Sequence, residues 1–142
     1  MSLHAVLGRN DPTPWLLTSD EPRADQMERL LGMLPASAEE PATASGHNRP
    51  ELATNVLDLL AEFGVTAEEP RVASLLDSML SHADSDGRFL AFGAQRSGPP
   101  VWGCVHCDTH AIADVAGRFG LGSDPRVRRA LAAAEDDLVE TD

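Results

Sequence analysis

The sequence of 142 residues contains no lysine and no tyrosine, and it has only two cysteines, two tryptophans and four phenylalanines. Two cysteines cannot staple a small secreted domain, so the sequence is not that of an extracellular disulfide scaffold. Aromatic side chains make up 4% of the chain, which leaves few rings for a cage around a cationic ligand. Long hydrophobic runs are also missing, because none approaches the roughly 20 residues that a transmembrane helix needs.

Basic side chains are scarce as well. Eleven arginines stand against 23 aspartates and glutamates, which gives a formal net charge of -12 at pH 7. A negative field of this size excludes nucleic acid and anionic membranes as expected partners, because both bind basic surfaces. The first nine residues lack the apolar stretch of a signal peptide. We therefore expect a cytoplasmic protein, and the use of arginine without lysine, beside abundant alanine, indicates a high-GC bacterial source.

What the sequence does contain is apolar residues at helical spacing. Hydrophobic residues make up 42% of the chain, which is enough for one domain with a core of its own. They recur at steps of three and four, as on one face of an α-helix. The stretches are Met27, Leu30, Leu31 and Leu34; Leu52, Val56, Leu59, Leu60 and Phe63; Val72, Leu75, Leu76, Met79 and Leu80; Ile112, Val115, Ala116 and Phe119; and Val127, Ala130, Leu131 and Ala134. We predict an all-α fold, with a further short helix around residues 15–17.

The turns between these stretches repeat. The segment 63–72 reappears as 119–127, with Phe-Gly at its front and an acid, a proline and an arginine at its end, and a fainter copy covers 19–23. In the two full copies a glycine ends one helix, an acid caps the next and a proline starts it. We therefore predict αα-hairpins in series, forming a single helical-repeat domain over residues 1–142. The predicted hairpins span about 12–34, 50–82 and 107–138, and the predicted loops span 35–49 and 84–103.

Four stretches carry a resemblance to a known family. They are Trp15-Leu16-Leu17, the turn Asp84-Ser85-Asp86-Gly87-Arg88-Phe89, the helix start Cys107-Asp108-Thr109, and the segment 120–131. Together they resemble the squalene cyclase and prenyltransferase-like α/α toroids, especially short bacterial members. The resemblance implies a partial α/α toroid whose inner helices line a cavity for an isoprenoid or a similar hydrophobic small molecule. A complete ring needs about twice as many hairpins, so the resemblance implies either that a second copy of the chain, as a homodimer, or a partner chain completes the ring, or that the chain is a shortened relative or a fragment with an open edge.

Two motifs of that family are missing. The Asp-x-Asp-Asp acid of squalene cyclases is absent, and Trp102-Gly103-Cys104 has a tryptophan where the Asp-Gly-Cys run of protein prenyltransferases has its acid. The sequence therefore leaves open whether the protein is an enzyme. The candidate catalytic carboxylates are Asp84, Asp86 and Asp108, although Asp-x-Asp-Gly also forms a stable turn without a catalytic role. The candidate substrate-binding side chains are Trp102, Phe89 and Phe92.

The densest cluster of reactive side chains is Cys104-Val105-His106-Cys107-Asp108-Thr109-His110. Cys-x2-Cys is a common zinc knuckle, so Cys104, Cys107 and His110 are candidate ligands of a zinc ion. Two other interpretations of Cys107 stay open: it could pack as a small apolar residue, or it could be a reactive thiol at a helix N-terminus.

The sequence supports three competing functions. The first is a squalene cyclase- or prenyltransferase-like protein that binds or transforms a hydrophobic small molecule. The second is a non-catalytic helical-repeat interaction module whose exposed edge pairs with itself or with a partner chain. The third is a small metal or thiol protein centred on Cys104, Cys107 and His110.

Overall fold

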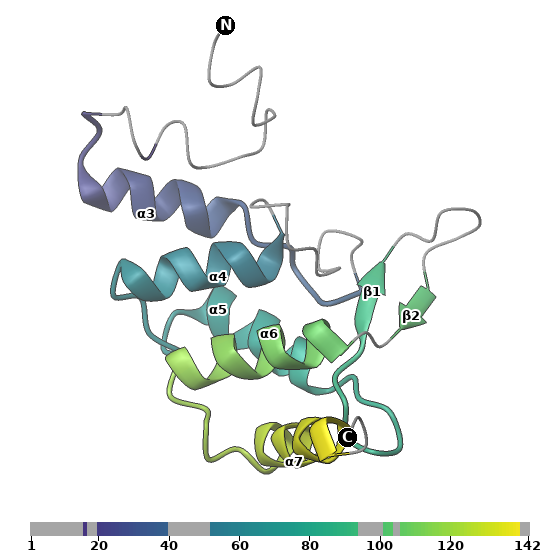
Figure 1. Cartoon of the computed structure of the whole chain (residues 1–142). Helices are drawn as coiled ribbons and strands as arrows, with labels where there is room; N and C mark the ends of the chain where they lie inside the picture. The colour runs from purple at the N-terminus through teal and green to yellow at the C-terminus, as the bar shows by residue number, and fades with distance from the viewer. Residues whose placement is uncertain (1–15, 17–19, 40–51, 94–100, 104–105, 140–142) are drawn as a thin grey trace, which may run out of the picture.

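The computed structural model of the chain describes residue 16 and residues 20–39, 52–93, 101–103 and 106–139 (Figure 1). Within these ranges the chain forms five α-helices and one antiparallel sheet of two short strands. The elements are α3 (Arg23–Gly32), α4 (Ala53–Glu62), α5 (Pro70–Leu80), β1 (Ala91–Gly93), β2 (Val101–Gly103), α6 (His106–Arg118) and α7 (Pro125–Val139). The predicted all-α fold is confirmed in its broad form, and the sheet is an addition to it. Of the predicted short helix around 15–17, only Leu16 is among the described residues.

The first helix of each later hairpin ends in the same way. Gly64 after α4 and Gly120 after α6 have φ angles of 84° and 81°, in the left-handed region that glycine adopts without strain. The next amide then closes back on the helix, with Val65 N donating to Leu60 O at 3.0 Å and Leu121 N donating to Ala116 O at 2.9 Å. This is the glycine stop that the repeated Phe-Gly predicts.

The second helix of each hairpin also starts in the same way. The Glu69 side chain accepts a hydrogen bond from Arg71 N at 3.4 Å, and the Asp124 side chain accepts one from Arg126 N at 2.8 Å. The predicted acid caps of α5 and α7 are therefore confirmed. The fainter copy before α3 differs, because Pro22 occupies the cap position and no side chain caps that helix.

Helices of neighbouring hairpins pack against one another. Helix α4 contacts α3 and α6, and α6 contacts α5 and α7. Figure 1 shows α3, α4 and α6 as successive ribbons, with α7 at the foot of the view. Arg23 at the start of α3 donates to Glu62 O at the end of α4 at 3.2 Å, so these two helices run antiparallel. Arg118 at the end of α6 donates to the Glu62 carboxylate at 2.8 Å, so α4 and α6 run parallel.

One hydrophobic core joins the helices. Its fully buried side chains include Leu30 from α3, Leu60 from α4, Leu75 from α5 and Phe89 from the segment that follows α5. Each such side chain contributes on the order of 1.5–3 kcal/mol through burial. None of the helices in the described ranges combines the length and the apolar character that crossing a bilayer requires.

The region 84–103, predicted as a loop, contains ordered structure on both sides of its undescribed residues. Phe92 in β1 pairs with Trp102 in β2, and the Trp102 ring stacks on His82 with centroids 3.8 Å apart. An isolated bridge between Ala83 and Phe89 closes the turn that precedes β1. The two strands are an addition to the loop predicted here, and the turn before β1 agrees with the Asp84–Phe89 turn that the sequence predicts.

Candidate functional site

Two arginines link neighbouring hairpins. Arg71, at the start of α5, contacts α3, and Arg126, at the start of α7, contacts α5. Arg71 donates from both terminal nitrogens to the Glu28 carboxylate of α3, at 2.9 and 3.0 Å. Arg126 donates to Asp77 of α5 at 2.9 Å. Each arginine thus ties its own cap acid to the neighbouring hairpin. The turns are recognisable in the sequence, but this contact between hairpins is not.

These ion pairs hold their acids in the charged state. The pKa of Asp124 lies below its ordinary value because the Arg126 side chain and backbone amide both donate to its carboxylate. The Arg71 guanidinium likewise lowers the pKa of Glu69 and of Glu28, mainly through side-chain hydrogen bonds. Solvent reaches all three carboxylates, so screening keeps the strength of these pairs modest.

A second ionic contact joins the first helices, α4 and α6. Arg118 Nε lies 2.9 Å from Asp58 Oδ1, and Arg118 Nη1 donates to Glu62 at 2.8 Å. Asp58 Oδ1 is buried and faces the guanidinium as an ion pair without the alignment of a hydrogen bond. Arg118 Nε also donates to Asp114 one turn earlier in α6, at 3.3 Å. One guanidinium therefore faces three carboxylates.

In the sequence repeat, a buried surface of α5 corresponds to an exposed surface of α7. Aligning Phe63 with Phe119 and Pro70 with Pro125 pairs Leu76 of α5 with Leu131 of α7. Leu76 is 1% exposed, whereas Leu131 is 48% exposed. The two leucines have the same place in the repeat, and they differ because the α6–α7 hairpin follows Leu76.

The open face forms a groove of about 640 Å³ between α6 and α7. Its lining residues are His110, Ala113, Asp114, Gly117, Arg118 and Leu131. We name these six residues the end face. Leu131 belongs to the apolar stripe that the sequence predicts for this helix, but its side chain is 48% exposed.

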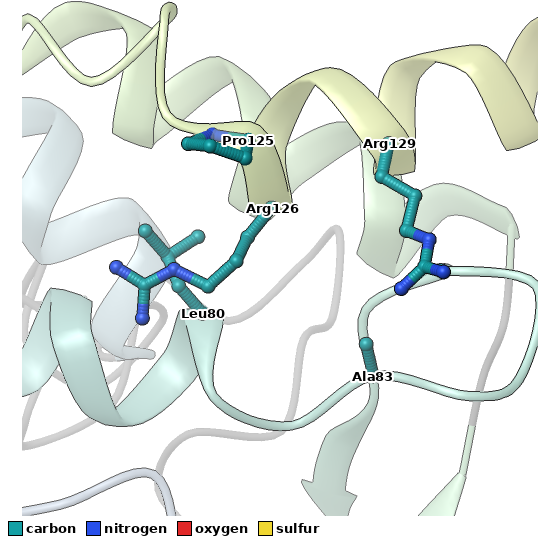
Figure 2. A pocket seen from close by; sticks show the side chains of 6 residues that line it. Leu80, Ala83, Pro125, Arg126 and Arg129 are labelled. Atoms are coloured by element: carbon teal, nitrogen blue, oxygen red, sulfur yellow. The ribbon is translucent and has the colours of Figure 1, made fainter.

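A second pocket, of about 300 Å³, lies where α5 meets α7 (Figure 2). Figure 2 shows Arg126 and Arg129 extending from α7, with Leu80 and Ala83 below them. The guanidinium of Arg126 is already engaged by acids of both hairpins. The stem of Arg129 covers Gly87, where an added Cβ would lie 2.6 Å from Arg129 Cγ. This pocket is thus part of the packing between the hairpins.

Two of the candidate catalytic carboxylates, Asp84 and Asp86, accept hydrogen bonds within the turn that follows α5. Asp84 Oδ1 accepts from the backbone amides of Asp86, Gly87 and Arg88, at distances between 2.9 and 3.0 Å. Asp86 accepts from the Arg88 side chain at 2.7 Å. Asp108 lies in the first turn of α6 and is 5% exposed. The Asp84 contacts are those of a turn, and a catalytic role for the three acids stays a prediction.

The candidate substrate-binding aromatic residues are divided between the core and the sheet. Phe89 is fully buried in the hydrophobic core. Phe92 and Trp102 are half-buried partners across the sheet, with ring centroids 5.3 Å apart. Trp102 has His82 on its face. Ligand binding by these three side chains stays a prediction.

Of the candidate zinc ligands, Cys104 lies outside the described residues. Cys107 is half-buried and His110 is exposed, three positions apart on α6. Within the described ranges, no group of three or more His, Cys, Asp or Glu side chains is arranged to hold a metal ion. Zinc binding by Cys104, Cys107 and His110 stays a prediction.

Comparison with known proteins relates the centre of the chain to a family of helical repeats. A family model described as pentatricopeptide repeat-containing protein matches residues 42–96, a range that contains α4 and α5. No curated protein and no solved structure matches the chain. The match covers less than half of the chain, so it marks a similarity to that family.

This finding corrects the resemblance drawn from the sequence. The matching family is one of helical repeats, and the assignment to squalene cyclase and prenyltransferase-like proteins is wrong. The partial toroid and the isoprenoid cavity were inferred only from that assignment, so no observation now supports them. The helical repeat itself is supported by the match and by the recurring caps of α4 to α7.

Proposed function

We propose that this protein is a non-catalytic helical-repeat interaction module that binds another protein through its end face. The observation that carries the proposal is the contrast between Leu76 and Leu131, which are equivalent in the repeat but 1% and 48% exposed. Leu131 is 48% exposed, so completing its burial would gain about half of the 1.5–3 kcal/mol that full burial of a leucine is worth, or about 1 kcal/mol. The family-model match to helical repeats supports the same class of function.

Site-specific photocrosslinking tests this proposal. A photoreactive amino acid at position 131 is expected to crosslink to a discrete protein when the full chain is produced in its own host. Position 136 is the matched control, because Asp136 is exposed on the same helix but lines a different groove with Arg88 and Arg129. The captured protein, once purified, should bind the unmodified chain and should not bind Leu131→Asp. Equal crosslinking from both positions, or none from 131, would refute the proposal.

A further inference from the structure

The preceding repeat shows what kind of element covers a surface equivalent to the end face. The equivalent face at the preceding repeat consists of α4 and α5 residues, and α6 lies against it. The covering element is therefore an α-helix, parallel to the helix below it, with an arginine in its last turn. That arginine, Arg118, reaches the buried Oδ1 of Asp58.

The end face repeats the receiving features of α4. Asp114 is the equivalent of Asp58, and its side chain is 69% exposed. Where α4 has Leu57 and Ala61, α6 has the smaller residues Ala113 and Gly117. A Cβ added at Gly117 would meet no atom within 4 Å, so the space above this part of α6 is open among the described residues. The small residue at position 117 allows the backbone of an incoming helix to approach closely, whereas Ala113 is buried in the core at 4% exposed.

The acidic cluster around Arg118, at the border of the end face, favours a basic partner. Asp58, Glu62 and Asp114 share one guanidinium, that of Arg118. Three carboxylates against one arginine leave this cluster with a net charge of about -2, by simple count at neutral pH. An additional cation placed over Asp114 would meet an attractive field, whereas an anion would be repelled.

We infer that the end face binds an amphipathic α-helix of a partner protein, with an apolar stripe over Leu131 and a basic residue in its last turn over Asp114. The recognition mode is that of a helix in a groove, and the helix lies on α6 as α6 lies on α4. This inference rests on the proposed function and specifies the partner of the same surface.

A peptide taken from the chain itself is the probe, because α6 is the helix seated on the equivalent face. It spans residues 106–120, carries Cys107→Ser and a fluorophore, and has a hydrocarbon staple between positions 110 and 114. Those positions lie on the groove side of α6, so the staple leaves the opposite side free for contact.

Fluorescence anisotropy with the full chain is expected to show saturable binding of this peptide. Leu131→Asp should weaken it at least tenfold, since a charged side chain would lie under the apolar stripe. Val139→Asp is the matched control, because Val139 is 73% exposed on the same helix and does not line the groove.

A charge exchange tests the basic residue. Arg118→Glu in the peptide should weaken binding about tenfold, and Asp114→Arg in the protein should restore it. Loss of binding with Leu131→Asp, together with this rescue, supports the inference. Binding insensitive to Leu131→Asp, or no binding of the peptide, overturns it, while crosslinking from position 131 would still support the proposed function. A homodimer that Leu131→Asp dissociates, seen by light scattering, also overturns it, because a second copy would then cover the face.

Discussion

Leucine-to-alanine substitutions at positions 76 and 131 test the repeat architecture in a single comparison. The two residues are chemically identical and equivalent in the repeat, and their exposed fractions are 1% and 48%. Truncating a fully buried leucine costs about 2–5 kcal/mol, because transfer free energy is lost and a cavity is left. Truncating Leu131 removes a side chain that is half in water and leaves no enclosed cavity. We expect that substitution to cost about 1 kcal/mol or less.

Urea unfolding followed by circular dichroism at 222 nm measures both values. With an m-value of about 2 kcal/mol per molar urea, Leu76→Ala should lower the midpoint by about 1–2.5 M. Leu131→Ala should lower it by less than about 0.5 M. Measurements at two protein concentrations tenfold apart are the control, because self-association through Leu131 would make its contribution depend on concentration. Equal losses of stability at both positions would refute the conclusion that the end face is open.

Two further predictions concern individual contacts, and a third concerns the cysteine cluster. The pKa of Asp124 is lowered below its ordinary value of 3.8, so its contribution to stability is complete above pH 3.8 and is lost as the pH falls through the lower, folded-state pKa. Asp124→Asn keeps a capping side chain and should flatten the loss of stability measured by urea unfolding between about pH 4 and 2; an unchanged slope would count against the ion pair. Gly87→Ala should lower the melting temperature more than Gly120→Ala, because both have positive φ but only Gly87 also has the Arg129 stem within 2.6 Å of an added Cβ; the reverse order would contradict this packing. If the cysteine cluster binds zinc, elemental analysis of the purified protein should find about one zinc per chain and much less in Cys107→Ser; absence of zinc from both proteins would reject the metal site.

The helices were predictable because their signals are local. Leucine and valine spacing marks the buried faces of α4 and α5, and the glycines at 64 and 120 mark where the first helices stop. The Asp84 turn was also recognisable, since an aspartate followed by Asp-Gly caps its own turn. Each of these features depends on residues within a few positions of one another.

The remaining features depend on distant residues. Arg71 reaches Glu28 and Arg126 reaches Asp77, across 43 and 49 positions of sequence, and helical spacing does not show which exposed acids face another hairpin. The strands were missed because each has only three residues, too short for an alternating pattern. Leu131 fits an apolar stripe as well as Leu76 does. Only the arrangement of the hairpins decides which of the two is covered.

The same arrangement places three arginines between acids of neighbouring hairpins. Arg71 and Arg126 are each shared between a cap acid and an acid of the neighbouring hairpin, and Arg118 is shared among three acids. These three arginines thus link neighbouring hairpins. Where α6 meets α4, Asp58 of α4 forms an ion pair with Arg118 of α6. At the end face, Asp114 offers the same carboxylate beside an exposed leucine, so a helix that brings its own basic residue satisfies both the charge and the apolar surface.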